Sequence, residues 1–315
     1  MPAEPTRRRV LRILAAAGAA SLAPPARATT REWRGAALGA DVSILFADAG
    51  SDVAQAAVTG ILAEVERLEA IFSLQRGDSE LSRLNAAGRI AAPSPDLAQV
   101  LAVSREAHAA TGGKFDPTVQ PLWRFHVDWY AAEKGRPRPG ERDLAAVRAR
   151  VGLSRVRIAS DAIELPEGAA LTLNGVAQGY ITDRACALLR AAGFRHVLVD
   201  LGETRALDGR GDGDAWRIAL PDGMRVMLSD GAIATSSGAA TPLGDKGDHH
   251  IFDPATGRSA PHWRWLSVAH ASAAMADALS TGLYCLPPEE AARAARAVSG
   301  AQFWGVTSSG VAVKV

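Results

Sequence analysis

Helix-like and strand-like segments follow one another in this chain without the regular strand–helix alternation of a doubly wound parallel sheet. Hydrophobic spacing predicts helices over 52–72, 96–111, 143–151, 180–192, 273–286 and 289–298. Short strands are predicted at 40–47, within 155–165, and at 196–201, 216–220, 225–228, 231–237, 303–306 and 311–315. Residues 126–142 mix Pro, Gly and charged residues, and this composition predicts a surface loop. The irregular mixture favours an α+β fold.

The first 28 residues are predicted to be an export signal rather than part of the fold. Arg7 and Arg8 lie in a twin-arginine context, an apolar run follows over 13–22, and Ala26-Arg27-Ala28 provides a cleavage site. The apolar run is too short to span a bilayer, so no membrane anchor is expected. We therefore expect a twin-arginine signal peptide over 1–28, a mature domain over 29–315, and a periplasmic location.

The segment 29–315 is long enough for one large domain or two closely packed lobes, and no repeat or linker divides it. The charges of the full chain nearly balance, with 35 basic and 34 acidic residues. No basic stripe is present, so nucleic acid is not an expected partner. Cys186 and Cys285 lie in apolar, helix-like segments, which predicts two buried free thiols rather than a disulfide framework or a metal site.

Asp277 and Thr281 are four residues apart in a predicted helix that is apolar nearly all round. This spacing places a carboxylate and a hydroxyl on one helical face. Two hard oxygen ligands suit Mg²⁺, which fills the rest of its coordination shell with water and substrate phosphate. The alternative is that Asp277 faces solvent or caps a helix, and that Thr281 bonds back to the carbonyl of residue 277.

His250 precedes a turn rich in Asp, Pro and Gly, residues 253–257, where an imidazole can meet a substrate. It can equally be a structural histidine that caps the turn. The neighbouring His249, and His262 beyond the turn, are expected at the surface.

Three segments rich in glycine or hydroxyl side chains are candidates for ligand contact. The Gly112-Gly113 pair ends a predicted helix, so it is either a helix cap or a close approach of the backbone to a ligand. Residues 174–180 lead from a strand into a helix whose N-terminus can bind an anion, although this segment taken alone favours an ordinary strand-to-helix loop. The Ser/Thr residues of 231–238 can hold a phosphate or satisfy backbone groups in a turn.

In combination, these segments resemble the FAD:protein FMN transferase (ApbE-type) family. The resemblance covers nearly the whole mature chain. The segments that carry it are 72–85, 112–119, 175–183, 199–203, 234–238, 250–257 and 276–281. It implies a single large domain of mixed sheets and packed helices, with the flavin site between two closely packed lobes.

The resemblance also implies an enzyme that cleaves FAD and transfers FMN to a Ser or Thr of an acceptor protein, releasing AMP with the help of Mg²⁺. Gly175, Asp277 and Thr281 match the metal ligands, and His250 matches the histidine that takes the proton of the acceptor hydroxyl. The matching FAD positions are Leu38, Gln75, Lys114, Phe115, Asp116, Thr172, Gln178 and Ile251. The chain departs from the common family residues at four of these, Leu38, Gln75, Thr172 and Gln178.

The form of residues 171–180 resembles a subgroup linked to nitrous-oxide respiration, whose acceptor is an FMN-binding membrane regulator. Two other functions fit the same residues: an FAD pyrophosphatase that gives FMN and AMP, and a non-catalytic periplasmic FAD-binding protein. His250, Asp277 and Thr281 favour an enzyme, because a carrier needs no base.

Overall fold

The structure is a computed structural model that describes residues 30–315 except 39, 48–49, 134 and 245–246. The predicted signal peptide and its cleavage site lie outside the described residues. No helix of the described chain is long and apolar enough to cross a membrane.

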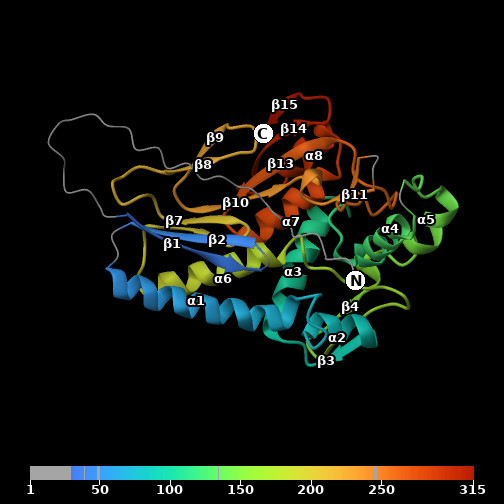
Figure 1. The fold of residues 1–315 in the computed structure, drawn as a ribbon, viewed down its shortest axis with the longest axis horizontal. Coiled ribbons are helices and arrows are strands. Elements are labelled where there is room, and N and C mark those ends of the chain that lie inside the picture. Colours follow the sequence, from blue (N-terminus) through green and yellow to red (C-terminus); the bar gives the residue numbers. More distant parts are fainter. Residues whose placement is uncertain (1–29, 39, 48–49, 134, 245–246) are drawn as a thin grey trace.

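An antiparallel sheet of eight strands forms the centre of the described structure, in the order β1-β2-β6-β7-β10-β13-β14-β15 (Figure 1). Its first four strands are β1 (Thr30–Ala37), β2 (Ala40–Ala47), β6 (Val197–Asp200) and β7 (Thr204–Leu207). The other four are β10 (Gly231–Ser236), β13 (Trp263–His270), β14 (Gln302–Thr307) and β15 (Ala312–Lys314).

Helices cover one face of this sheet and a hairpin covers the other. The helices are α1 (Ser51–Phe72), α3 (Pro95–Ala110), α6 (Ala177–Ala191), α7 (Ala273–Tyr284) and α8 (Pro288–Arg296). The hairpin consists of β8 (Trp216–Ala219) and β9 (Arg225–Leu228). Side chains alternate across the sheet as strand geometry requires: Val197 and Val199 join the core under the helices, and Leu198 joins the core under the hairpin.

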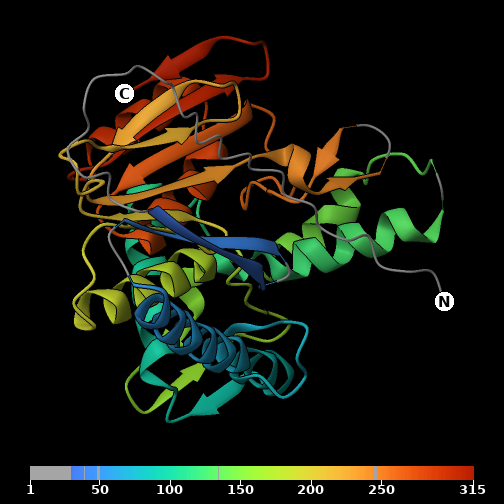
Figure 2. The ribbon, with the colours of Figure 1, turned by 60° about the vertical axis from the view of Figure 1, so that its left-hand side comes forward.

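Two smaller groups of elements complete the described chain. A three-stranded sheet, β3 (Arg89–Ala91), β5 (Ala162–Glu164) and β4 (Arg157–Ile158), lies beside α2 (Glu80–Ala87). The second group contains α4 (Gln120–Ala132), α5 (Glu141–Arg148), and the paired β11 (Pro242–Leu243) and β12 (Asp248–His249). It extends away from the main sheet in Figure 2 and has its own apolar cluster around Leu122, Leu243 and Phe252.

The α+β expectation is confirmed, and most predicted helices and strands lie within a few residues of their observed ends. Cys186 and Cys285 are free and buried, as expected. The loop predicted over 126–142 is wrong in its first part, because α4 continues to Ala132. The Pro, Gly and most of the charged residues that suggested a loop lie after Ala132, whereas α4 buries Leu122 and His126. The strands β1, β3, β7, β11, β12 and β13 were not expected.

Candidate active site

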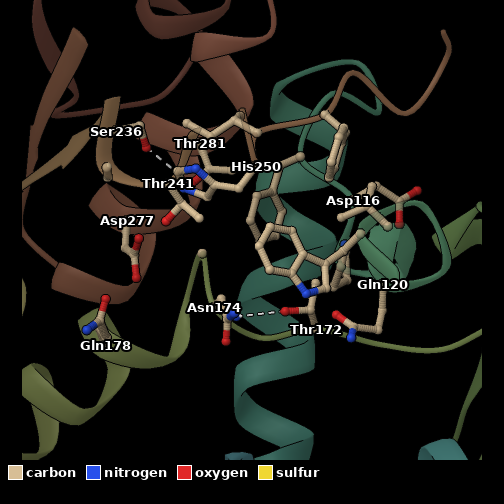
Figure 3. A pocket seen from close by; sticks show the side chains of 18 of the residues that line it. Asp116, Gln120, Thr172, Asn174, Gln178, Ser236, Thr241, His250, Asp277 and Thr281 are labelled. Atoms are coloured by element: carbon tan, nitrogen blue, oxygen red, sulfur yellow. Dashed lines mark hydrogen bonds between the residues drawn. The ribbon is translucent and has the colours of Figure 1, made fainter. Parts of the chain in front are cut away.

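A cavity lies between the main sheet with its helices and the group that contains α4 (Figure 3). Its polar lining comes from the start of α6, the end of β10, the interior of α7, the start of α4 and the loops between these elements. The lining residues are Leu38, Lys114, Phe115, Asp116, Pro117, Val119, Gln120, Trp123, Thr172, Asn174, Gly175, Gln178, Ser236, Ala240, Thr241, His250, Ile251, Phe252, Asp277 and Thr281. These segments are far apart in sequence, so the fold alone brings them together.

Asp277 is buried at 4 % exposure on α7, in a helix whose side chains are nearly all buried. Its Oδ2 accepts a hydrogen bond from the Gly179 N–H at 3.2 Å. Val176, at the cap position of α6, has no side chain that can accept, so the carboxylate of Asp277 takes that role at the positive end of the helix. Asp277 therefore caps a helix without facing solvent, and it also lines the cavity.

Thr281 does not bond back to the carbonyl of residue 277. Ser280 donates to that carbonyl at 3.0 Å, and the Thr281 hydroxyl lies 3.3 Å from the Ser236 Oγ. Gly175 packs against Thr281 so closely that an added Cβ would lie 2.9 Å from Thr281 Oγ1. Only glycine fits there without moving the hydroxyl.

The donor chemistry at this end of the cavity fits a hard cation. Asp277 offers a carboxylate, Thr281 a hydroxyl and the adjoining Gly175 a backbone carbonyl, and Mg²⁺ prefers oxygen ligands of these types. Among the described residues, no group of three His, Cys, Asp or Glu side chains could hold a metal ion. A metal here would therefore rely on one carboxylate with hydroxyl and backbone oxygens beside it.

The first turn of α6 and the first turn of α7 are each capped by a carboxylate from the other helix. Asp183 of α6 accepts hydrogen bonds from the Ala273 and Ala274 N–H groups at 2.9 and 3.1 Å, and from the Ser272 hydroxyl at 2.7 Å. Arg205 forms an ion pair with the same carboxylate. The two helices approach so closely that an added Cβ on Gly179 would clash with the Ala273 carbonyl. Asp183 and Asp277 thus fix the position of α7 against α6.

His250 follows β12 and lines the cavity. Its backbone N–H donates to the Thr241 carbonyl at 3.2 Å. The neighbouring His249 is not a surface residue, which corrects the expectation from sequence. Its Nε2 lies 3.0 Å from the Ala260 carbonyl, and its Nδ1 accepts from the Ile251 N–H at 3.3 Å. Burial lowers the pKa of His249, so the neutral ring is a structural part of the loop that carries His250.

The segment after α3 brings Lys114, Phe115 and Asp116 to the cavity. Gly112 and Gly113, with φ of 60° and 85°, form the helix cap and do not line the cavity, so the capping interpretation holds. The Lys114 ammonium lies 2.8 Å from both carboxylate oxygens of Asp253. Asp116 accepts from the Thr118 and Leu153 N–H groups at 2.8 and 3.0 Å, so its carboxylate is used within the protein.

The ApbE family model matches residues 38–303, which include the described residues of this cavity. The chain belongs to the ApbE family.

Curated relatives and solved structures agree with this assignment. The FAD:protein FMN transferase of Haemophilus influenzae is 28% identical over 306 residues, covering 89% of this chain and 87% of the relative. That of Escherichia coli K12 is also 28% identical, covering 75% of this chain and 72% of the relative. The apo structure of the Pseudomonas stutzeri flavinyl transferase ApbE has a TM-score of 0.80 at 24% identity, covering 93% of this chain and 97% of that one; it supports the fold. The Vibrio cholerae flavin transferase ApbE has a TM-score of 0.76 at 27% identity, with 91% and 97% covered.

Eleven of the twelve residues singled out from the sequence of this ApbE-family chain line the cavity. They are Leu38, Lys114, Phe115, Asp116, Thr172, Gly175, Gln178, His250, Ile251, Asp277 and Thr281. Gln75 does not: it lies in the exposed turn after α1, where its N–H donates to the Ser73 hydroxyl at 3.1 Å. The chemical role of each residue stays a prediction.

The sequence interpretation missed several lining residues, of which Gln120 and Trp123 on α4 are the most distinctive. They are three residues apart, and this spacing places them on one face of a helix. They also follow directly after the Asp116-Pro117-Thr118 segment. This spacing was visible in the sequence, but the loop expected from residue 126 onward gave no reason to place a helix there.

Proposed function

We propose that this chain is an FAD:protein FMN transferase, which cleaves the pyrophosphate of FAD and attaches FMN through a phosphoester to a Ser or Thr of an acceptor protein. The observation that carries the proposal is the meeting of His250, Asp277, Thr281 and Gly175 in one cavity. Membership of the ApbE family supports it, because the curated relatives carry this activity in their names.

The proposed metal is Mg²⁺, held by Asp277, Thr281 and the carbonyl of Gly175. When bound, it would neutralise part of the charge of the pyrophosphate. Asp277 suits this role because its carboxylate is buried and fixed by the Gly179 N–H.

His250 is proposed to act as the general base. In the reaction, the acceptor hydroxyl oxygen forms a bond to the flavin-side phosphorus while the bond from that phosphorus to the bridging oxygen breaks, and AMP leaves. The hydroxyl proton passes to a ring nitrogen of His250, because histidine is the side chain that most often acts as a general base. The Thr241 and Ile251 backbones hold the loop that presents the ring. Positioning of both reactants in one cavity supplies much of the remaining rate.

We further propose that the chain is exported by the twin-arginine route and acts in the periplasm as a mature domain over 29–315. This rests on Arg7 and Arg8 and on the Ala26-Arg27-Ala28 cleavage site. The proposed acceptor is an FMN-binding protein, such as a membrane-bound respiratory or regulatory protein.

The test is to incubate the protein with FAD, Mg²⁺ and a candidate acceptor domain, and to weigh the acceptor by mass spectrometry. A mass increase of one FMN, with AMP released, supports the transferase. Free FMN with an unmodified acceptor would instead indicate a pyrophosphatase, and intact FAD would indicate a binding protein. An Asp277→Ala variant and a chelator test the metal: turnover at the wild-type rate in either case would contradict the proposed ligands.

A further inference from the structure

Gln120 and Trp123 present a side-chain amide and an indole ring to the cavity. Gln120 is buried at 5 % exposure at the first position of α4, and Figure 3 shows its amide turned toward Thr172. Within the described part of the chain, neither the Gln120 amide nor the Trp123 indole N–H has a hydrogen-bond partner. The amide opens to the cavity, where a ligand or water can complete its hydrogen bonds.

The indole of Trp123 is in a similar position. It packs against the cluster of Leu122, Leu243 and Phe252 and also lines the cavity. No other ring of the described residues stacks on it. Aromatic faces without a partner in a cavity are suited to stacking on a planar ligand.

Trp129, on the same helix, has the contacts within the protein that Trp123 lacks. Its indole N–H donates to the Pro137 carbonyl at 2.8 Å, and the Arg136 guanidinium lies 3.6 Å from its ring centroid. Both the indole N–H and the ring face of Trp129 therefore interact with other residues of the chain. The contrast indicates that Trp123, besides packing on its cluster, has a ring face and an N–H available to a ligand in the cavity.

We propose that Gln120 and Trp123 form a subsite that recognises one heteroaromatic ring of the dinucleotide substrate. The indole supplies a stacking surface, and the amide supplies a neighbouring donor and acceptor for the ring edge. Adenine presents such a donor–acceptor pair, and amide side chains read it in this way. The isoalloxazine ring also carries an adjacent N–H and carbonyl. The chemistry required of the ligand is the same in both cases.

This subsite rests on the proposed function, since it assumes that FAD enters the cavity. It lies on α4, whereas the proposed metal ligands lie on α7 and in the loop before α6. A single FAD molecule has its rings on either side of its pyrophosphate, so a ring subsite apart from the phosphate end is what such a substrate requires. Thr172 is a lining neighbour that the same ring can contact.

The experiment measures binding of FAD, ADP and FMN by isothermal titration calorimetry to the wild type and to Gln120→Ala, Trp123→Ala and Trp123→Phe. ADP and FMN each carry one of the two rings, so they distinguish the two sources. We expect Trp123→Ala to weaken FAD and one of the fragments by roughly 5- to 100-fold, while the other fragment binds as before. Gln120→Ala should weaken the same fragment, and Trp123→Phe should keep most of the affinity.

The matched control is Trp129→Ala, which removes an indole from the same helix outside the cavity. This variant should bind all three compounds as the wild type does. Wild-type affinity for both fragments in Gln120→Ala and Trp123→Ala would overturn the subsite. Equal weakening of both fragments would also overturn it, because it would indicate a general disturbance of α4. If the wild type binds none of the three compounds, the proposed function itself fails.

Discussion

At the residue scale, the adjacent histidines His249 and His250 are expected to have different roles. His249 holds its loop through the Ala260 carbonyl and the Ile251 N–H, so it is unsuitable as a neutral control. We expect His250→Ala to slow FMN transfer by roughly 10²- to 10⁴-fold while FAD affinity stays near the wild-type value, because the ring acts on the acceptor. The measurement is transfer rate beside FAD affinity.

The suitable control is His196→Ala, since His196 bonds the Gly209 carbonyl at 2.8 Å and does not line the cavity. It should transfer FMN at close to the wild-type rate. Loss of FAD affinity in His250→Ala would show instead that the histidine holds the substrate.

Gly175 gives a second prediction at this scale. In Gly175→Ala the new methyl would lie 2.9 Å from Thr281 Oγ1 and 3.4 Å from the Phe115 ring, so the hydroxyl must move. We expect turnover to fall by roughly 10²-fold, since small displacements at a reacting site are costly. Gly60→Ala is the control, because nothing lies within 4 Å of a Cβ added at this position. Alanine also has a higher helix propensity than glycine in the middle of α1. Equal activity of the two variants would remove the reason for glycine at 175.

At the element scale, Asp183 stabilises the start of α7, the helix that carries Asp277 and Thr281. Its replacement by Ala removes two N–H caps, the Ser272 bond and the Arg205 ion pair together. We expect the free energy of unfolding to drop by about 2–4 kcal/mol, measured by urea denaturation. Asp230→Ala breaks only an exposed pair with Arg190 and should change stability by less than about 0.5 kcal/mol. Comparable losses in both variants would contradict the capping role.

The same elements show how far sequence patterns reach. The helical period of 52–72 predicted α1 because its apolar residues repeat along one face. The candidate ligands Asp277 and Thr281 were found because a polar pair in an apolar helix is conspicuous. The cap that Asp277 provides for α6 could not be found, because Gly179 lies 98 positions away in the chain. β13 was missed as well, although it pairs with β10 and β14.

At the scale of the whole molecule, we expect the group around α4 to be more sensitive to acid than the sheet and its helices. His126 on α4 is stacked on Phe252, with 4.6 Å between the ring centroids, and bonds the Gly257 carbonyl. His249 lies in β12 of the same group. Burial lowers the pKa of both histidines below the ordinary value of 6.5. The core under α1 is built mainly from aliphatic and aromatic side chains.

A histidine whose pKa is lowered by folding adds stability that is fully present above pH 6.5 and is lost as the pH falls below it. We therefore expect acidification from about pH 7 to pH 5 to loosen the group around α4 before the main sheet, across the range in which free histidine gains its proton. Hydrogen exchange, corrected for the intrinsic effect of pH, should show amides of α4 losing protection while amides of α1 keep it. Since this group carries one wall of the cavity, FAD affinity should fall over the same interval. Parallel loss of protection in α4 and α1 would mean that the two parts unfold as one unit, and the buried histidines would then set the acid stability of the whole molecule.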